Sequence, residues 1–200
     1  RCAGVSADIA VHPRGRPPDP SHAPLMPLPQ MVPAVRAIAD RLMWEGAIIS
    51  AFAELLPEGA TERPAGGGDW TVVQVFAHLA INERLHAGNL ERYLRGEVPR
   101  PPGFDINQWN AETVGAARET PVSESLDILA QERARLYTMF STIDDRMLER
   151  DFVPGRALGA ALSAWAGHYA EHAFDIIEVV PELHLAPIIV RWLARLDLEA

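Results

Sequence analysis

The chain has 200 residues and a net charge of −9, with 27 acidic residues against 18 basic residues that are all arginine. The absence of lysine excludes a Walker A phosphate loop, a Schiff base and a Ser–Lys catalytic pair. The single cysteine, Cys2, excludes a Cys-based zinc site, an iron–sulfur cluster and an internal disulfide, so any metal must be held by His, Asp or Glu.

The N-terminal segment, residues 1–30, differs in composition from the remainder. Prolines crowd the first 33 positions, and no periodic apolar pattern accompanies them, so we expect this segment to be disordered. The folded domain is predicted to span residues 31–200, starting near Met31. These first 30 residues lack the apolar stretch of a signal peptide, and no apolar run approaches the ~18–20 residues of a membrane span. We therefore expect a cytoplasmic protein that does not enter a membrane.

Four long helices are predicted from apolar residues that recur every three or four positions. Prolines, glycines and caps mark their ends, such as Thr71 and Gln74, which fit a capping box. No stretch alternates with a period of two, so no strands are expected. Shorter helices are predicted at 107–119 and 188–198, the second packing on the outside. The expected fold is an all-α four-helix bundle, with long helices at about 35–56, 72–95, 121–140 and 159–180.

Two histidines stand one turn apart on the last long helix. His168 and His172 share the face that carries Trp165 and Ile176, and we expect that face to point inward. The i,i+4 spacing lets two imidazoles bind one divalent ion, because both rings leave the helix on the same side. Two hydrogen-bonded core histidines explain the same spacing, so the pair alone leaves both interpretations open.

A third histidine on the second long helix favours the metal interpretation. His78 lies about 10 Å from the start of its helix, and if the four helices alternate in direction, it shares a level with His168 and His172. His86 lies two turns further along and is expected to be too deep to join them. Three imidazoles leave a coordination position open, as in catalytic sites, and suit Zn, Ni, Fe or Cu.

Other polar residues near these histidines are candidates for supporting roles. Asp175 is placed to orient the ring of His172, or it is a surface carboxylate. Glu171 and Tyr169 are the candidate catalytic residues; Glu171 is a base or else a solvated residue, and Tyr169 and Asn82 are candidates to line the pocket. His168–His172 also fits the H-x-x-E-H pattern of inverted zinc proteases, but no mixed sheet domain is predicted. Four arginines either bind a substrate carboxylate or lie on solvated helix faces: Arg84, Arg92, Arg95 and Arg100.

Together these segments resemble the DinB-like (DinB/YfiT) superfamily of metalloenzymes over about residues 32–180. The resemblance is carried by 70–74 leading to His78, then by Phe104-Asp105 and 107–110, then by Gly167-His168-Tyr169-x-x-His172. It implies a four-helix bundle with a metal on His78, His168 and His172. Trp109, in the linking segment, covers the site or anchors the core.

Relatives in that superfamily include thiol S-transferases, a mycothiol-dependent maleylpyruvate isomerase and hydrolase-like resistance proteins, and several form homodimers. The isomerase branch carries Glu where this chain has His168, and no sterol-carrier-like domain is seen here. The resemblance implies a divalent metal (Zn, Ni or Fe) that activates mycothiol, bacillithiol or water for transfer to a small electrophile. A metal-dependent hydrolase and a non-catalytic metal-binding bundle are the alternatives. The expected partners are a small-molecule substrate and a second copy of the chain, with no nucleic acid.

Overall fold

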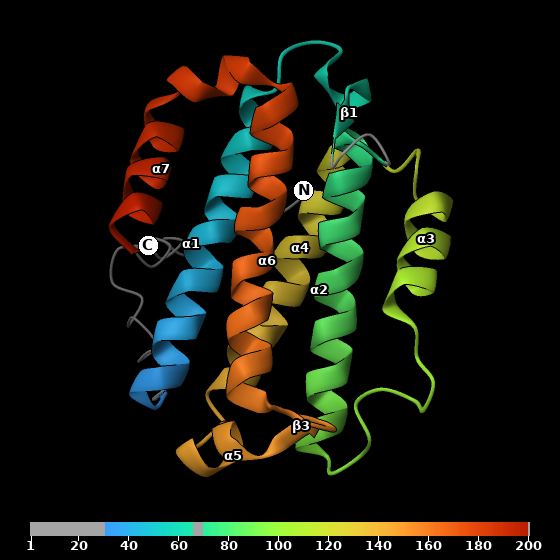
Figure 1. The fold of residues 1–200 in the computed structure, drawn as a ribbon, viewed down its shortest axis with the longest axis vertical. Coiled ribbons are helices and arrows are strands. Elements are labelled where there is room, and N and C mark those ends of the chain that lie inside the picture. Colours follow the sequence, from blue (N-terminus) through green and yellow to red (C-terminus); the bar gives the residue numbers. More distant parts are fainter. Residues whose placement is uncertain (1–30, 66–69, 200) are drawn as a thin grey trace, which may run out of the picture.

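The computed structural model of the protein describes residues 31–65 and 70–199, and Figure 1 shows that long helices lying side by side dominate this part. The predicted N-terminal tail lies outside the described residues. The long helices are α1 (Pro33–Leu55), α2 (Val72–Leu94), α4 (Val122–Phe140) and α6 (Leu158–Val179). Shorter ones are α3 (Ile106–Ala116), α5 (Asp145–Glu149), α7 (Pro187–Glu199) and 3-10 turns at Ala60–Glu62 and Pro181–Leu185. The predicted four-helix bundle is confirmed.

Two small β-hairpins correct the expectation of no strands. β1 (Pro64–Ala65) pairs with β2 (Trp70–Thr71), and β3 (Asp151–Val153) pairs with β4 (Arg156–Ala157), both antiparallel. Strands of two or three residues are too short to show a period of two, so the sequence pattern could not reveal them. Each hairpin leads directly into a long helix, β2 into α2 and β4 into α6, and so fixes where that helix begins.

The helix directions also differ from the prediction. The four long helices do not alternate: α2 and α4 run the same way, and α1 and α6 run against them (Figure 1). The segment between α2 and α4, which contains α3, returns along the outside of the bundle to the end at which α2 began. As a result α2 packs against α4 and α6, and α1 packs against α6 and α4. Helices α2 and α6, which carry the candidate histidines, are therefore antiparallel.

Helix α7 packs on the outside of the bundle, as predicted. Trp192 is fully buried, and its ring meets the edge of Phe52 on α1 at 6.0 Å between centroids. Its indole N–H donates a hydrogen bond of 2.8 Å to the buried Glu45 carboxylate, also on α1. Burial of the large indole and satisfaction of its N–H together hold α7 to α1.

The start of α2 is fixed by the predicted capping pair. The Thr71 backbone N–H donates to Gln74 Oε1 at 3.0 Å, which satisfies a donor that has no partner within the helix. We expect Gln74→Ala to lower the free energy of unfolding by about 1 kcal/mol, measured by urea denaturation. Gln108→Ala, which removes only an exposed contact to Glu112, is the matched control and should change stability by less than about 0.5 kcal/mol. Equal losses in the two variants would contradict this role for Gln74.

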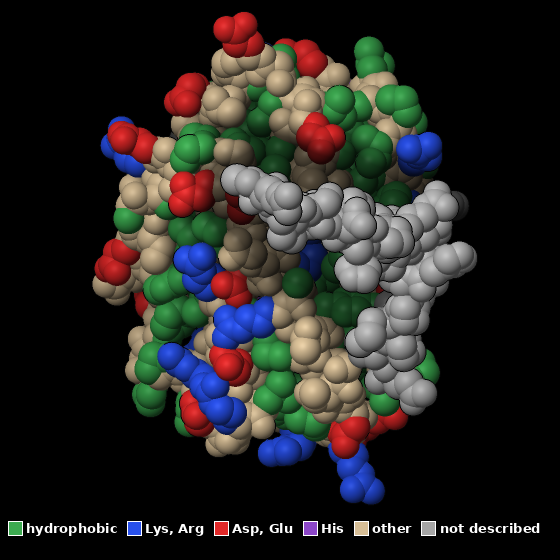
Figure 2. Space-filling view, turned by 180° about the vertical axis from the view of Figure 1, so that it is seen from behind, with side chains coloured by type: hydrophobic (Ala, Val, Ile, Leu, Met, Phe, Trp, Pro, Cys, Tyr) green, Lys and Arg blue, Asp and Glu red, His purple; other side chains and the backbone are tan. Residues whose placement is uncertain are grey.

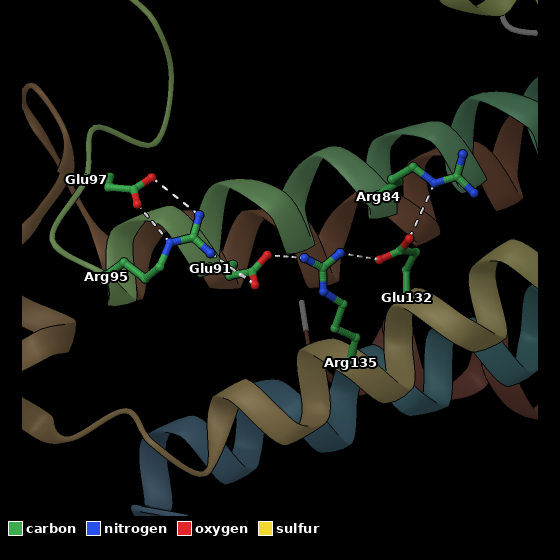
Figure 3. Close-up of polar contacts among 6 residues, drawn as sticks. All are labelled: Arg84, Glu91, Arg95, Glu97, Glu132 and Arg135. Carbon is green, nitrogen blue, oxygen red and sulfur yellow. Dashed lines mark hydrogen bonds and ion pairs between the residues drawn. The ribbon is translucent and has the colours of Figure 1, made fainter.

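The outer faces of α2 and α4 are joined by a row of ion pairs (Figure 3). Arg135 of α4 bonds Glu91 of α2 and Glu132 of its own helix, and Arg84 of α2 reaches Glu132 at 3.4 Å. Arg95 continues the row to Glu91 and Glu97. Exposed pairs of this kind contribute roughly 0–1 kcal/mol each, so they set the register of the two surfaces more than the stability of the bundle.

Seen from behind the view of Figure 1, the surface shows basic and acidic side chains close to one another (Figure 2). No histidine is seen among the side chains coloured in that view. Within the described residues, no helix is both long and apolar enough to cross a membrane.

Candidate metal centre

The three predicted histidines meet between α2 and α6. His168 Nε2 lies 3.1 Å from His78 Nε2 and 3.0 Å from His172 Nε2, and one nitrogen from each ring falls within 4.8 Å of the others. His78 lies in the second turn of α2, while His172 lies about two turns before the end of α6. Because the two helices are antiparallel, these two residues share a level and His168 lies one turn deeper. The prediction that the three histidines meet assumes that their two helices run parallel. The three do meet, but the assumption about helix direction is wrong.

The environment of the site keeps the imidazoles of His78 and His168 neutral. Burial, together with a smaller effect of the neighbouring histidines, lowers the pKa of His78 to about 2 and that of His168 to about 3. Neutral imidazoles present the nitrogen lone pairs that bind a metal. These two residues therefore need no deprotonation step at neutral pH before they can act as metal ligands.

Two further side chains orient the rings of the triad. His172 Nδ1 lies 2.8 Å from Asp175 Oδ2, so its N–H donates to the carboxylate and the ring turns Nε2 toward His168. The Asn82 amide nitrogen lies 2.9 Å from His78 Nδ1 and 3.4 Å from Asn110 Oδ1 of α3. Asp175 and Asn82 thus occupy the positions that the sequence suggested for them.

Removing the carboxylate of Asp175 should weaken metal binding without abolishing it. We expect Asp175→Asn to reduce zinc affinity about tenfold, because the amide no longer fixes the tautomer of His172 or raises its basicity. Competition with a chromophoric chelator measures the affinity. Asp127→Asn, an exposed carboxylate on α4, is the matched control and should leave the affinity unchanged. An unaltered affinity in Asp175→Asn would show that the carboxylate does not support the site.

Aromatic rings pack above and below the triad. Trp70, in β2, lies 4.5 Å from His78 and 6.1 Å from His172 between ring centroids. On the deeper side, His86 stacks on Trp165 at 4.4 Å, and its ring is 6.4 Å from that of His168. These rings shield the site from water on two sides.

His86 and Trp70 show what the sequence could and could not reveal. His86 is predicted to lie too deep to join the triad, and it does not join the cluster, although the antiparallel helices bring its ring to 6.4 Å from that of His168. It is buried against Trp165, and this burial lowers its pKa well below the usual value. Trp70 belongs to the 70–74 segment that carries the family resemblance, but nothing in the sequence was a reason to place its ring against the triad. The signal that could have placed Trp70 near His78 is its position one residue before Thr71, the cap of α2, because the pairing of β1 with β2 holds the start of that helix.

A cavity of about 300 Å³ opens beside the triad at His168. Glu171, the predicted base, lines it, and Asn110 of α3 contributes to its wall. The complete lining consists of Asn82, His86, Arg100, Ile106, Asn110, Arg156, Ala164, Trp165, His168 and Glu171. Among the predicted arginines, Arg84 and Arg95 instead point into the surface ion pairs of Figure 3.

Tyr169 is not brought to this cavity. It is buried on the other side of α6, where its hydroxyl lies 3.5 Å from Arg133 Nη2. Arg133 in turn lies 3.7 Å from the buried carboxylate of Glu83. Trp109 is half-buried on α3, with its ring 6.2 Å from that of Phe104, and does not line the cavity either.

The donor set and its spacing fit a divalent metal. Nitrogens that bind one tetrahedral zinc at ~2.0–2.1 Å lie about 3.3 Å apart, close to the 3.0 and 3.1 Å measured between these Nε2 atoms. An all-imidazole set suits Zn, Ni, Fe or Cu. The Asp175 contact supplies the outer support that metal-binding histidines need.

Comparisons with known proteins agree with this architecture. YfiT from Bacillus subtilis, described as a probable metal-dependent hydrolase with an unusual four-helix bundle topology, is similar with a TM-score of 0.65 and 21% identity over 82% of this chain and 95% of its own. A mycothiol-dependent maleylpyruvate isomerase is similar with a TM-score of 0.59 and 14% identity, over 78% of this chain and 66% of its own. No curated protein sequence matches the chain.

The sequence also matches the family model of the DinB superfamily over residues 39–175. This range begins in α1 and ends at Asp175, so it includes all three histidines of the cluster. The match covers more than half of the chain, and the fold of the two similar structures is the same. The protein therefore belongs to the DinB superfamily.

Proposed function

We propose that the protein is a metal-dependent enzyme in which His78, His168 and His172 hold a divalent ion and a low-molecular-weight thiol or water is transferred to a small electrophile. One observation carries the proposal: the ring nitrogens of the three histidines converge, and the central one, His168, lines a cavity of about 300 Å³. A structural metal site is closed by protein ligands, whereas a catalytic one keeps a position open to substrate. Among the described residues no fourth His, Cys, Asp or Glu joins this cluster.

The chain itself offers no strong nucleophile for such a reaction. It has no lysine, and its one cysteine is Cys2. When bound, a divalent ion with a free position supplies Lewis acidity, which lowers the pKa of a thiol or water so that a nucleophile forms at neutral pH. The nucleophile is therefore external, and mycothiol and bacillithiol are the thiols to test.

The residues around the triad have distinct tasks in this proposal. Asp175 holds the Nδ1–H of His172 and fixes the direction of its lone pair. The Glu171 carboxylate, on the cavity wall, accepts the proton that the nucleophile releases. Trp70 and Trp165 limit the access of bulk water to the rings. Glu171 also favours hydrolysis as a second candidate, because activation of water gains more from a neighbouring base than activation of a thiol does.

An assay with and without thiol separates the two reactions. Protein loaded with zinc, nickel or iron(II) is tested on 1-chloro-2,4-dinitrobenzene with mycothiol or bacillithiol, and on a 4-nitrophenyl ester without thiol. Thiol-dependent product supports transfer, and ester cleavage without thiol supports hydrolysis. Either activity must be lost in His168→Ala. The proposal would be contradicted, and a non-catalytic bundle favoured, if side chains fully coordinate the bound metal and the metal-loaded protein is inactive in both assays.

The predicted homodimer and cytoplasmic location stay predictions. Sedimentation equilibrium of the full chain tests the first, with a mass twice the 22.0 kDa of one chain as the expected result.

A further inference from the structure

Two arginines from separate segments line the cavity beside the triad. Arg100 lies in the link that follows α2, and Arg156 lies in β4, directly before α6. Because α2 and α6 are antiparallel, the end of one helix lies next to the start of the other (Figure 1). The two guanidinium groups therefore reach the same cavity, although the sequence separates them widely.

Neither of these arginines has an acidic partner in the described part of the chain. The guanidinium of Arg100 lies 5.4 Å from the Phe104 ring, and its buried Nε has no hydrogen-bond acceptor. Arg95, only five positions earlier, is paired with both Glu91 and Glu97. Acidic residues are thus available nearby, and the fold nevertheless leaves Arg100 and Arg156 free to bind something else.

The charge of the cavity differs from that of the protein. Arg100 and Arg156 line the same cavity, and burial, followed by the positive charge of Arg156, lowers the pKa of Arg100. Glu171 is the acidic residue among the lining side chains, so two positive charges face one negative charge. In a chain with a net charge of −9, such a positive cavity attracts anions selectively.

We propose that Arg100 and Arg156 bind an anionic oxygen group, a carboxylate or a phosphate, on the small molecule that enters this cavity. The planar fork of arginine matches both groups and can hold them with two parallel hydrogen bonds. The volume of about 300 Å³ is at the lower end for small-molecule sites, which restricts the ligand to a compact acid. The proposal deepens the proposed function, since it gives the substrate class of the same site and rests on that function for the reaction itself.

Calorimetric titration of metal-free protein at low salt tests the binding step without the metal. The probes are succinate, inorganic phosphate and the neutral analogue succinamide. We expect succinate or phosphate to bind, and succinamide not to bind. Arg100→Gln should weaken binding about tenfold and the more exposed Arg156→Gln about threefold, because each removes a charge-assisted hydrogen bond. The anion that binds with the higher affinity, succinate or phosphate, is the one that the site prefers.

Matched variants guard against indirect effects. Arg84→Gln removes an exposed arginine of α2 that pairs with Glu132, and it should bind the anion as the wild type does. Arg100→Lys keeps the charge but loses the fork, and should fall between wild type and Arg100→Gln. Equal affinities in wild type and both glutamine variants, or binding of succinamide as tight as that of succinate, would overturn the proposal.

The same titrations with zinc separate this inference from the proposed function. If zinc does not bind but succinate binding still depends on Arg100, the anion site stands and the metalloenzyme proposal fails. If zinc binds at the triad and neither anion binds with or without it, the anion site fails alone.

Discussion

His168→Ala should reduce the affinity of the protein for zinc at least about 100-fold. His168 is the central member of the triad, because its Nε2 contacts both His78 Nε2 and His172 Nε2. Its loss leaves two imidazoles whose rings are 4.7 Å apart at their centroids, and two ligands hold a divalent ion far more weakly than three. Chelator competition measures the affinity directly, and the rise of the melting temperature with added zinc measures it through linkage.

The matched control for this experiment is His86→Gln. It also removes a buried imidazole, 6.4 Å from His168 between centroids, but it leaves the triad intact. We expect the control to bind zinc as the wild type does, while His168→Ala shows almost no zinc-dependent rise in melting temperature. Circular dichroism confirms that both variants are folded. If the two variants lost affinity equally, zinc binding would not depend on the triad.

Arg133→Met should destabilise the protein by about 3 kcal/mol at pH 8. Arg133 is the cation nearest the Glu83 carboxylate, at 3.7 Å, and the side chains are only 11% and 2% exposed. Gly46 of α1 makes room for the guanidinium, since a Cβ at that position would collide with it. Removing one partner of a buried ion pair leaves the other charge uncompensated, which costs about 3–5 kcal/mol. Urea denaturation in the presence of EDTA measures the loss without a contribution from metal.

The cost of Arg133→Met should be smaller at pH 5.5. Burial raises the pKa of Glu83 from 4.5 to about 7, although Arg133 opposes the shift. Between pH 4.5 and pH 7 Glu83 is protonated in the folded state but ionised in the unfolded state. The contribution of this group to the free energy of unfolding therefore increases as the pH falls through 7. At pH 5.5 Glu83 is protonated in the folded protein and no longer needs a cation. Comparing variant and wild type at each pH cancels the contributions of the histidines.

Two further variants test this explanation of the Arg133 effect. Arg135→Met, on the exposed face of the same helix (Figure 3), should cost less than about 1 kcal/mol. Glu83→Gln in the Arg133→Met background should recover part of the stability at pH 8, because the unpaired charge is gone. A loss for Arg133→Met that is the same at pH 8 and pH 5.5, with no recovery in the double variant, would mean that lost packing is responsible.

The sequence was sufficient to predict the bundle because its signals are local. Apolar spacing, Pro33, Pro57 and Pro181 located the long helices to within a few residues, and the Thr71–Gln74 pair located the start of α2. The direction of the helices was not predictable in this way. It depends on the path of the link between α2 and α4, and nothing in the composition of that link tells whether it crosses one end of the bundle or returns along its side.

The same distinction applies to the site. His168 and His172 are neighbours by helical spacing alone, and Asp175 lies one turn from His172, so their mutual contacts could be predicted. Contacts between α2 and α6 could not, because they depend on which residues of antiparallel helices share a level. For this reason the stacking of His86 on Trp165, and the meeting of Arg100 and Arg156 in one cavity, appear only in the structure.

The central claim is that His78, His168 and His172 hold one divalent ion beside an open cavity. A crystal structure of the zinc-loaded protein, with anomalous data collected on both sides of the zinc absorption edge, tests it most directly. We expect one anomalous peak at ~2.0–2.1 Å from the three Nε2 atoms, with no fourth side chain bound and the cavity toward Glu171 open. The absence of a peak at this position, or a fourth protein ligand closing the site, would show that the triad does not hold an ion with a free coordination position.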